Sequence, residues 1–306
     1  MNKLIVILGP TASGKTRLAV NLASKYSGEI ISADSRQIYK GMDIGTGKDL
    51  NEYHINNDNI PYHLINIINP QQDYSVFKFK QDCNTALYTI ESKNKIPILC
   101  GGTGLYIESI LLDYKMPKTK PNLNLRKKLD NKSLDQLKNK LLLLDRNVFN
   151  EEYHISKRRM IRSIEIIKDK NNIAMKQEGK NILDKSIVLG INMERPVILS
   201  KIKERLHERL EEGMIEEVQL LLNSGISYER LAYFGLEYKF VGKYLSKNIN
   251  YDEMKQLLNN AINKFSKRQM TFFRRMEKRG IKIHWINSNN IHEIYSLINN
   301  FLPGTL

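Results

Sequence analysis

Short apolar runs alternate with helical patterns over the first 112 residues. The runs predicted to be strands are Leu4–Leu8, Ile30–Ser32, His63–Ile67 and Ile96–Cys100. Each is followed by Gly, Pro or polar residues, as expected of strands that end at a turn or helix start. This alternation predicts an α/β fold with a parallel sheet covered by helices on both faces. Later strands are expected at Ile187–Ile191 and Ile281–Trp285, with a long helical stretch between them.

Residues 114–185 follow a different pattern. Leucines recur there at helical spacing and no strong strand is present: Leu123, Leu125, Leu129, Leu134, Leu137, Leu141. The pattern predicts an inserted, mainly helical domain, with residues 1–113 and 186–306 forming the core. The segment Lys176-Gln177-Glu178-Gly179-Lys180 is expected to be a loop, and residues 251–279 one long helix.

Charge is concentrated in the same region. The chain has 48 Lys and Arg against 33 Asp and Glu, a formal net charge of +15. Residues 114–185 hold 19 of the bases and 9 of the acids, a net +10. A Lys-rich surface that aids solubility is one interpretation, but charge gathered in one segment favours a polyanionic partner.

Membrane and secreted classes are not indicated. No stretch of about 18 apolar residues is present, so no membrane span is expected. The N-terminal run is cut short by Gly9-Pro10, which argues against a signal peptide. The two cysteines, Cys83 and Cys100, have no metal-site spacing and provide no disulfide framework. We therefore expect a cytoplasmic protein.

The most specific motif follows the first strand. Gly9-Pro10-Thr11-Ala12-Ser13-Gly14-Lys15-Thr16 matches G-x-x-x-x-G-K-[ST] and precedes a helical pattern. Glycines let backbone N–H groups wrap a phosphate, and the helix N-terminus adds positive potential. Lys15 supplies a mobile charge, and Thr16 a hydroxyl for phosphate or Mg²⁺. The core is thus predicted to be P-loop NTPase-like and to bind a di- or triphosphate.

Two further turns lie at strand ends. Asp34 follows the second strand, where a carboxylate serves as a general base or magnesium ligand, or alternatively as a helix N-cap. Gly101-Gly102-Thr103-Gly104 follows the fourth strand and indicates either close approach of a substrate or a turn with positive φ. An ordinary ATPase would place Asp where Gly101 stands, which argues against that class.

Taken together, the motifs resemble the tRNA dimethylallyltransferase (IPP transferase) family of the bacterial type, since no zinc-finger set follows the core. The resemblance covers the chain nearly end to end, in order: Gly9–Thr16, Asp34–Tyr39, Gly41–Thr46, Tyr62–Ile65, Tyr74–Phe77, Gly101–Tyr106, Arg158–Glu165, Gly213–Val218 and Lys267–Phe272. It implies transfer of a dimethylallyl group from dimethylallyl diphosphate, with Mg²⁺, to N6 of the adenine 3′-adjacent to the anticodon in tRNAs reading U-initial codons.

The resemblance also implies roles for residues. Asp34 would be the catalytic base, with Lys15, Thr16 and Arg209 at the diphosphate and Thr16 a ligand of Mg²⁺. The loop Gly9, Pro10, Thr11, Ala12, Ser13, Gly14, Lys15 and Thr16 would bind the diphosphate. The tRNA anticodon stem-loop would contact Asp34, Ser35, Arg36, Gln37, Thr103, Arg126, Arg158, Arg159, Met160, Ile161, Arg162 and Arg268. For Arg205 and Arg209, one helical turn apart, surface pairing with Glu208, Glu211 or Glu212 is the alternative.

Three segments depart from the family pattern. Thr46-Gly47-Lys48-Asp49 stands where Thr-Ala-Lys-Pro is usual, and the other two are Gly235-Leu236-Glu237-Tyr238 and Ile262-Asn263-Lys264. The main alternative function is a P-loop small-molecule kinase using ATP. It would explain the phosphate loop and Asp34, but neither the basic insertion nor the basic C-terminal helix.

Overall fold

The computed structural model describes residues 3–55, 58–151, 153–169, 182–287 and 290–302. The chain divides into two compact units. Unit 1 comprises Met1–Tyr114 with Lys180–Leu306, and unit 2 comprises Lys115–Gly179. From the sequence, the boundaries were predicted at 113/114 and 185/186. In the structure the second boundary is at 179/180, which falls among residues outside the described ranges.

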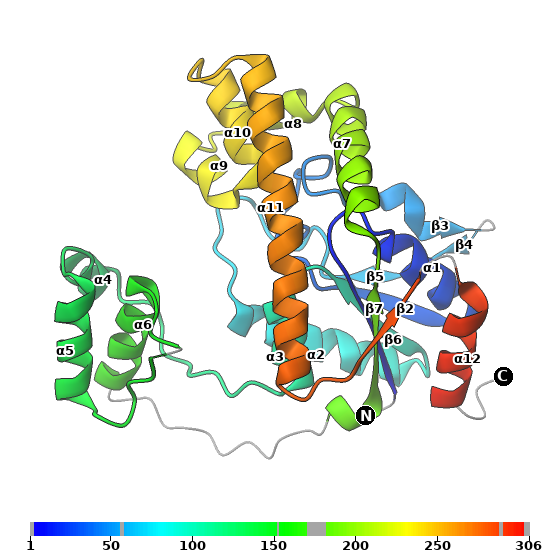
Figure 1. The fold of residues 1–306 in the computed structure, drawn as a ribbon, viewed down its shortest axis with the longest axis horizontal. Coiled ribbons are helices and arrows are strands. Elements are labelled where there is room, and N and C mark those ends of the chain that lie inside the picture. Colours follow the sequence, from blue (N-terminus) through cyan, green and yellow to red (C-terminus); the bar gives the residue numbers. More distant parts are fainter. Residues whose placement is uncertain (1–2, 56–57, 152, 170–181, 288–289, 303–306) are drawn as a thin grey trace. The chain divides into compact units, whose positions relative to one another are not determined.

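Unit 1 is built on a six-stranded parallel sheet (Figure 1). Its strand order is β5 (Tyr62–His63), β2 (Gly28–Ser32), β6 (Ile96–Gly101), β1 (Leu4–Leu8), β7 (Ser186–Ile191) and β8 (Ile283–Ile286). In the central register, Ile7 lies between Cys100 of β6 and Leu189 of β7. The predicted α/β class and the parallel sheet are confirmed.

Helices cover both faces of this sheet, as the continuous apolar strands require. Alternate residues of β1 enter different cores. Leu4, Val6 and Leu8 pack with α2 (Val76–Ser92), α3 (Gly104–Leu111) and α11 (Tyr251–Lys278), whereas Ile5 and Ile7 pack with α1 (Lys15–Lys25) and α12 (Ile291–Phe301). No helix among the described residues is long and apolar enough to span a bilayer.

The stretch between β7 and β8 is helical, as predicted. It contains α7 (Arg195–Glu211), α8 (Met214–Asn223), α9 (Tyr228–Phe234), α10 (Leu236–Leu245) and the 28-residue α11. Helix α11 begins at a capping box in which Asn250 and Glu253 bond each other's backbone N–H at 2.9 Å. At its far end, Glu277 accepts the indole N–H of Trp285 at 2.9 Å, and the ring packs over Gly190, where a Cβ would lie 2.6 Å from it.

One predicted strand is wrong. Of His63–Ile67 only His63 is in a strand, because Leu64 and Asn66 adopt left-handed φ values of 63° and 57°. The segment instead bonds the turn after β2, with Asn66 N–H donating to Gln37 O and Ile67 N–H to Ile38 O. The 3-10 helix η1 (Leu50–Tyr53) and the short pair β3 (His54–Ile55) and β4 (Asp58–Asn59) were not predicted.

Unit 2 contains α4 (Leu123–Asp130), α5 (Leu134–Leu144) and α6 (Lys157–Lys168). These helices enclose a small core of Leu129, Leu137, Leu141, Met160, Ile161 and Ile164. The predicted loop Lys176–Lys180 lies outside the described residues; the 3-10 turn η2 (Leu183–Lys185) precedes β7.

Candidate active site

The phosphate loop joins β1 to α1. Ala12 and Gly14 have φ values of 61° and 80°, which turn the backbone toward the helix start. Lys15 Nζ donates to the carbonyl of Pro10 at 2.8 Å, so the side chain folds back over its own loop. Ser13 Oγ is buried and has no hydrogen-bond partner among the described residues. A buried polar atom without a partner suits a ligand that enters the loop.

A cavity of about 390 Å³ lies in front of this loop. Its lining combines residues 12–17 with the loop around Asp49 and the side of α7. The cationic residues of the lining are Lys15, Arg17, Lys201, Arg205 and Arg209, and the acidic ones are Asp49, Glu52, Glu204, Glu208 and Glu212. The size is that of a small-ligand site, and the facing cations suit a compact anion.

Burial perturbs two of these cations. Burial lowers the pKa of Lys15 to about 8. The nearby Arg205 lowers this pKa as well, whereas Cys100, Asp34 and Asp49 raise it. The pKa of Arg209 is lowered by burial first and by Arg205 second. Arg209 Nη2 is buried without a hydrogen-bond partner among the described residues. An anion in the cavity would therefore find two poorly solvated positive groups.

The arginines pair with a residue that the sequence analysis did not assign to them. Arg205 Nη2 lies 2.7 Å from Asp49 Oδ2, and Arg209 Nη2 lies 3.7 Å from Asp49 Oδ1. Pairing with Glu208, Glu211 or Glu212 was the alternative; in the described structure Glu211 instead pairs with His207 at 3.3 Å. The i, i+4 spacing did place Arg205 and Arg209 on one side of α7, facing the phosphate loop.

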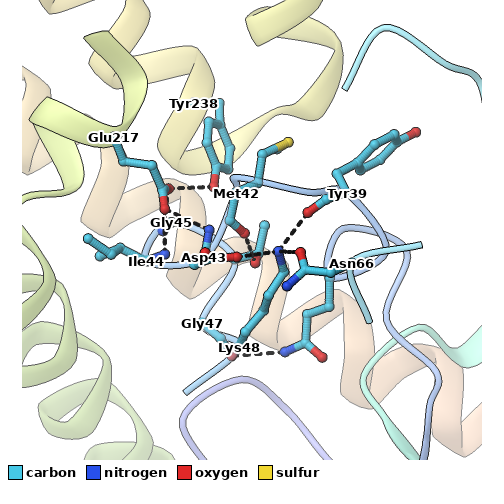
Figure 2. Close-up of polar contacts among 12 residues, drawn as sticks. Tyr39, Met42, Asp43, Ile44, Gly45, Gly47, Lys48, Asn66, Glu217 and Tyr238 are labelled. Atoms are coloured by element: carbon cyan, nitrogen blue, oxygen red, sulfur yellow. Dashed lines mark hydrogen bonds and ion pairs between the residues drawn. The ribbon is translucent and has the colours of Figure 1, made fainter. Parts of the chain in front are cut away.

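The loop that carries Asp49 is held by a carboxylate from α8 (Figure 2). Glu217 accepts the backbone N–H groups of Asp43 at 2.6 Å, Ile44 at 2.7 Å and Gly45 at 3.0 Å. It also accepts the hydroxyl of Tyr238 at 2.8 Å. Three successive N–H groups on one carboxylate fix the backbone of this loop.

A lysine holds the other end of the loop. The fully buried ammonium of Lys48 donates to Tyr39 O at 2.6 Å, Asp43 Oδ1 at 2.6 Å and Asn66 Oδ1 at 2.5 Å (Figure 2). All three of its donors are thereby used. Gly47 then passes so close to α7 that a Cβ would lie 1.6 Å from Arg209 and 2.2 Å from Arg205. A side chain at Gly47 would have to displace the guanidinium groups of both arginines, and the left-handed φ of 59° at this position also favours glycine.

Asp34 lies half-buried at the end of β2. Its Oδ1 accepts the backbone N–H of Arg36 at 2.8 Å, which closes a turn rather than starting a helix. The helix N-cap alternative is therefore wrong. Gln37, in the same turn, donates to Gly47 O at 2.8 Å and accepts from Ser32 Oγ at 2.8 Å. The turn 34–37 is thus tied to the loop that carries Asp49.

The turn after β6 packs directly against the turn after β2. Thr103 Oγ1 accepts the N–H of Ser35 at 3.1 Å, and Thr103 N–H donates to Ala33 O at 3.1 Å. A Cβ on Gly101 would lie 2.3 Å from Ala33 O. Gly101, Gly102 and Gly104 have no positive φ, so a left-handed turn does not explain them. Glycine instead permits close approach, by the backbone of Ala33 at Gly101 and by the side chains of Gln269 and Phe272 at Gly102 and Gly104.

Gln269 of α11 connects the two loops and was missed in the sequence. Its Oε1 accepts the N–H of Thr11 at 2.9 Å, and its Nε2 donates to Gly102 O at 3.0 Å. It lies in the family motif Lys267–Phe272, beside Arg268 in the basic part of α11, but no role was assigned to it. Arg268 itself is exposed. Arg36, the remaining residue of turn 34–37, lies over the ring of Tyr233 at 5.2 Å.

The candidate RNA-contacting residues of unit 2 occupy different environments. Arg126 and Arg162 both bond the buried carboxylate of Glu165, at 2.7 Å and 3.2 Å. The side chains of Met160 and Ile161 lie in the core of the unit. Arg158 is exposed, and Arg159 lies over the ring of Tyr153 at 5.3 Å. Arg158 and Arg159 are therefore the cations of this cluster not committed to Glu165.

The parallel sheet with a complete phosphate loop at the end of β1 defines a P-loop protein whose cavity suits a phosphate-bearing ligand. The model of the family described as IPP transferase matches residues 37–276, and that described as isopentenyl transferase matches residues 2–59. The chain is 48% identical to tRNA dimethylallyltransferase 1 of Azobacteroides pseudotrichonymphae, over 97% of each chain. It is 44% identical to tRNA dimethylallyltransferase 1 of Syntrophus aciditrophicus, over 100% of this chain and 99% of the relative. The chain belongs to the IPP transferase family.

Solved structures agree with this assignment. The tRNA isopentenylpyrophosphate transferase of Bacillus halodurans is 30% identical with a TM-score of 0.71, covering 100% of this chain and 98% of that one. A eukaryotic dimethylallyltransferase acting on tRNA shares the fold, with a TM-score of 0.82 at 22% identity, covering 99% of this chain and 80% of that one.

Proposed function

We propose that this protein transfers the dimethylallyl group of dimethylallyl diphosphate to N6 of the adenine 3′-adjacent to the anticodon, in tRNAs reading U-initial codons. The observation that carries the proposal is the cavity between the phosphate loop and α7, where Arg209 Nη2 is buried without a hydrogen-bond partner among the described residues. Family membership selects a prenyl diphosphate as the ligand that fills it.

The cationic residues of the cavity and Asp34 have separate roles in the proposed reaction. As the C–O bond of the donor breaks, its electron pair passes to the diphosphate, where Lys15, Arg205 and Arg209 stabilise the developing charge. The adenine amine forms the new C–N bond and gives its proton to Asp34. The carboxylate of Asp34 is placed by Arg36 N–H at the carboxyl end of β2, at the same edge of the sheet as the phosphate loop and separated from β1 by β6.

The donor set fits Mg²⁺ when it is carried in with the diphosphate. Thr16 offers one hydroxyl from the first turn of α1. Among the described residues, no cluster of three or more His, Cys, Asp and Glu could hold a metal ion. Mg²⁺ commonly uses few protein ligands and completes its shell with substrate phosphates and water. When bound, it would neutralise charge on the leaving group.

The acceptor is proposed to reach the turns at the ends of β2 and β6. An adenine N6 stacked in an anticodon loop is accessible only once the base leaves the stack. Asp34, Ser35, Arg36, Gln37 and Thr103 form one hydrogen-bonded surface at which such a base would be read. Phosphate contacts would hold the anticodon stem-loop. We propose that they come from Arg158 and Arg159 of the mainly helical unit 2 and from the exposed Arg268. In this proposal Arg126, Met160, Ile161 and Arg162 support helix α6.

The kinase alternative is not favoured. Gly101 occupies the strand end where an ATP-using P-loop enzyme commonly holds a magnesium-binding Asp, and it packs against Ala33 with no room for a side chain. The matched relatives are tRNA dimethylallyltransferases over nearly their full length. The free, buried thiols of Cys83 and Cys100 fit the cytoplasm proposed from the sequence.

The test is incubation of the protein with tRNA and either labelled dimethylallyl diphosphate or labelled ATP. We expect the prenyl label to enter tRNA and the ATP label to remain in ATP. Lys15→Ala should abolish transfer by weakening donor binding, whereas Lys25→Ala, an exposed lysine at the other end of α1, should not. Transfer of phosphate from ATP to a small acceptor, with no prenyl label in tRNA, would refute the proposal.

A further inference from the structure

Asp49 is one of the residues that line the phosphate cavity, together with the phosphate loop and α7. Its two carboxylate oxygens lie 2.7 Å from Arg205 and 3.7 Å from Arg209. Both arginines and Asp49 line the cavity. A carboxylate and a phosphate compete for the same guanidinium donors. The cavity therefore contains an anion of its own that overlaps in function with the ligand it is proposed to bind.

The backbone delivers Asp49 to this position. Its φ of 45° is left-handed, which few residues other than Gly, Asn and Asp adopt. Lys48 immediately before it is anchored by three oxygen acceptors, and the backbone of Gly47 lies against the guanidinium groups of both arginines. Only the Asp49 side chain, 40% exposed, has space to leave the arginines for solvent.

We propose that Asp49 is a displaceable counter-anion for Arg205 and Arg209, and that it thereby positions the two arginines and limits the affinity of the cavity for diphosphate. This inference rests on the proposed function. Without diphosphate, the carboxylate keeps the guanidinium groups aimed at the cavity. When diphosphate binds, its oxygens take over these donors and Asp49 turns to solvent.

The same competition favours release of the product. Dimethylallyl diphosphate carries one oxygen esterified to carbon, and cleavage of that C–O bond leaves the oxygen on free diphosphate as an additional anionic group. Repulsion by the Asp49 carboxylate therefore acts more strongly on the product than on the donor. Burial first and the neighbouring Asp49 carboxylate second raise the pKa of Glu52 in the cavity wall.

Calorimetric titration with inorganic diphosphate and Mg²⁺ tests the inference. Asp49→Asn keeps the shape and the tolerance of left-handed φ while removing the charge, and we expect it to bind roughly five- to tenfold more tightly than wild type. Asp49→Glu retains a carboxylate and should return affinity toward the wild-type value. The control Asp73→Asn removes an equal charge from an exposed pair with Arg230, also 2.7 Å long, and should change nothing.

Kinetics supply a second measurement. With tRNA and donor, Asp49→Asn should slow steady-state turnover more than single-turnover transfer, because product leaves more slowly. Unchanged or weaker diphosphate binding by a folded Asp49→Asn variant, or an equal gain in Asp73→Asn, would overturn the inference. Failure of the wild-type protein to bind diphosphate at all would instead overturn the proposed function.

Discussion

The loop between Met42 and Lys48 depends on one carboxylate, and its removal is the sharpest test of how the site is built. Glu217→Ala deletes the acceptor of four hydrogen bonds, three from successive backbone N–H groups and one from Tyr238. In the described part of the chain, no other side chain accepts a hydrogen bond from these N–H groups. We expect the loop to lose its fixed conformation and Asp49 its place beside the arginines.

The size of the effect follows from the environment of these bonds. A hydrogen bond contributes about 1 kcal/mol net, and more when the acceptor is charged. The N–H of Asp43 lies near solvent and can be rehydrated, whereas Gly45 and Tyr238 are buried. We therefore expect Glu217→Ala to lower the free energy of unfolding by about 3 kcal/mol. Glu217→Gln, which retains one acceptor oxygen, should cost about half as much.

Chemical denaturation measures the stability, and hydrogen exchange at the amides of Asp43, Ile44 and Gly45 measures the loop itself. Glu216→Ala is the matched control, because Glu216 is the preceding acid on α8 and is exposed. Protection of the three amides should fall in Glu217→Ala and stay unchanged in Glu216→Ala. Equal stability of the two variants, with protection retained in both, would refute the assigned role of Glu217.

Three further predictions concern chemistry and RNA. Asp34→Ala should reduce turnover by about 10²–10⁴-fold with little change in tRNA affinity; equal losses in kinetics and binding would assign Asp34 a structural role. Affinity for inorganic diphosphate should fall above pH about 8 by up to about tenfold per unit through deprotonation of Lys15, because the ligand requires protonated Lys15 and the pKa of Lys15 in the free protein is about 8. Lys15→Arg, which stays charged, should remove this fall, and an unchanged calorimetric pH profile would contradict the assignment. In tRNA titrations, Arg158→Ala should lower the slope of log affinity against log salt by up to about one unit. Arg162→Ala should instead lower the free energy of unfolding by about 1–2 kcal/mol, because it removes an ion pair with Glu165. The opposite result for each variant would exchange the two roles.

The sheet was predictable because its signal is local. Each central strand is a continuous apolar run closed by turn residues, and burial on both faces imposes that composition. The strand prediction for the segment after His63 failed because this segment is a short apolar run interrupted only by Asn66, as in a buried strand. Its backbone instead takes left-handed φ at Leu64 and Asn66 to bond the turn after β2, and polarity alone does not encode that partner.

Those parts of the site that lie in contiguous motifs or at strand ends were also predictable. The phosphate loop is a contiguous motif whose geometry follows from its own residues, and Asp34 lies at the carboxyl end of a parallel strand, at the same edge of the sheet as this loop. Glu217 and Gln269 contact residues more than 150 positions away along the chain. No spacing in the sequence marks such residues. Asp49 was visible as a departure from the family pattern, but its pairing with α7 required the tertiary structure.

The single tryptophan of this chain gives a spectroscopic consequence of the β7–β8 edge. Trp285 lies in unit 1, hydrogen-bonded to the end of α11 and packed on Gly190, so its fluorescence reports on the sheet and on that helix together. Unit 2 contains no tryptophan and is silent at the same wavelength, although its helices contribute fully to far-ultraviolet circular dichroism. Melting curves recorded by the two methods therefore separate the unfolding of the units without any label, and their difference is the signal of unit 2.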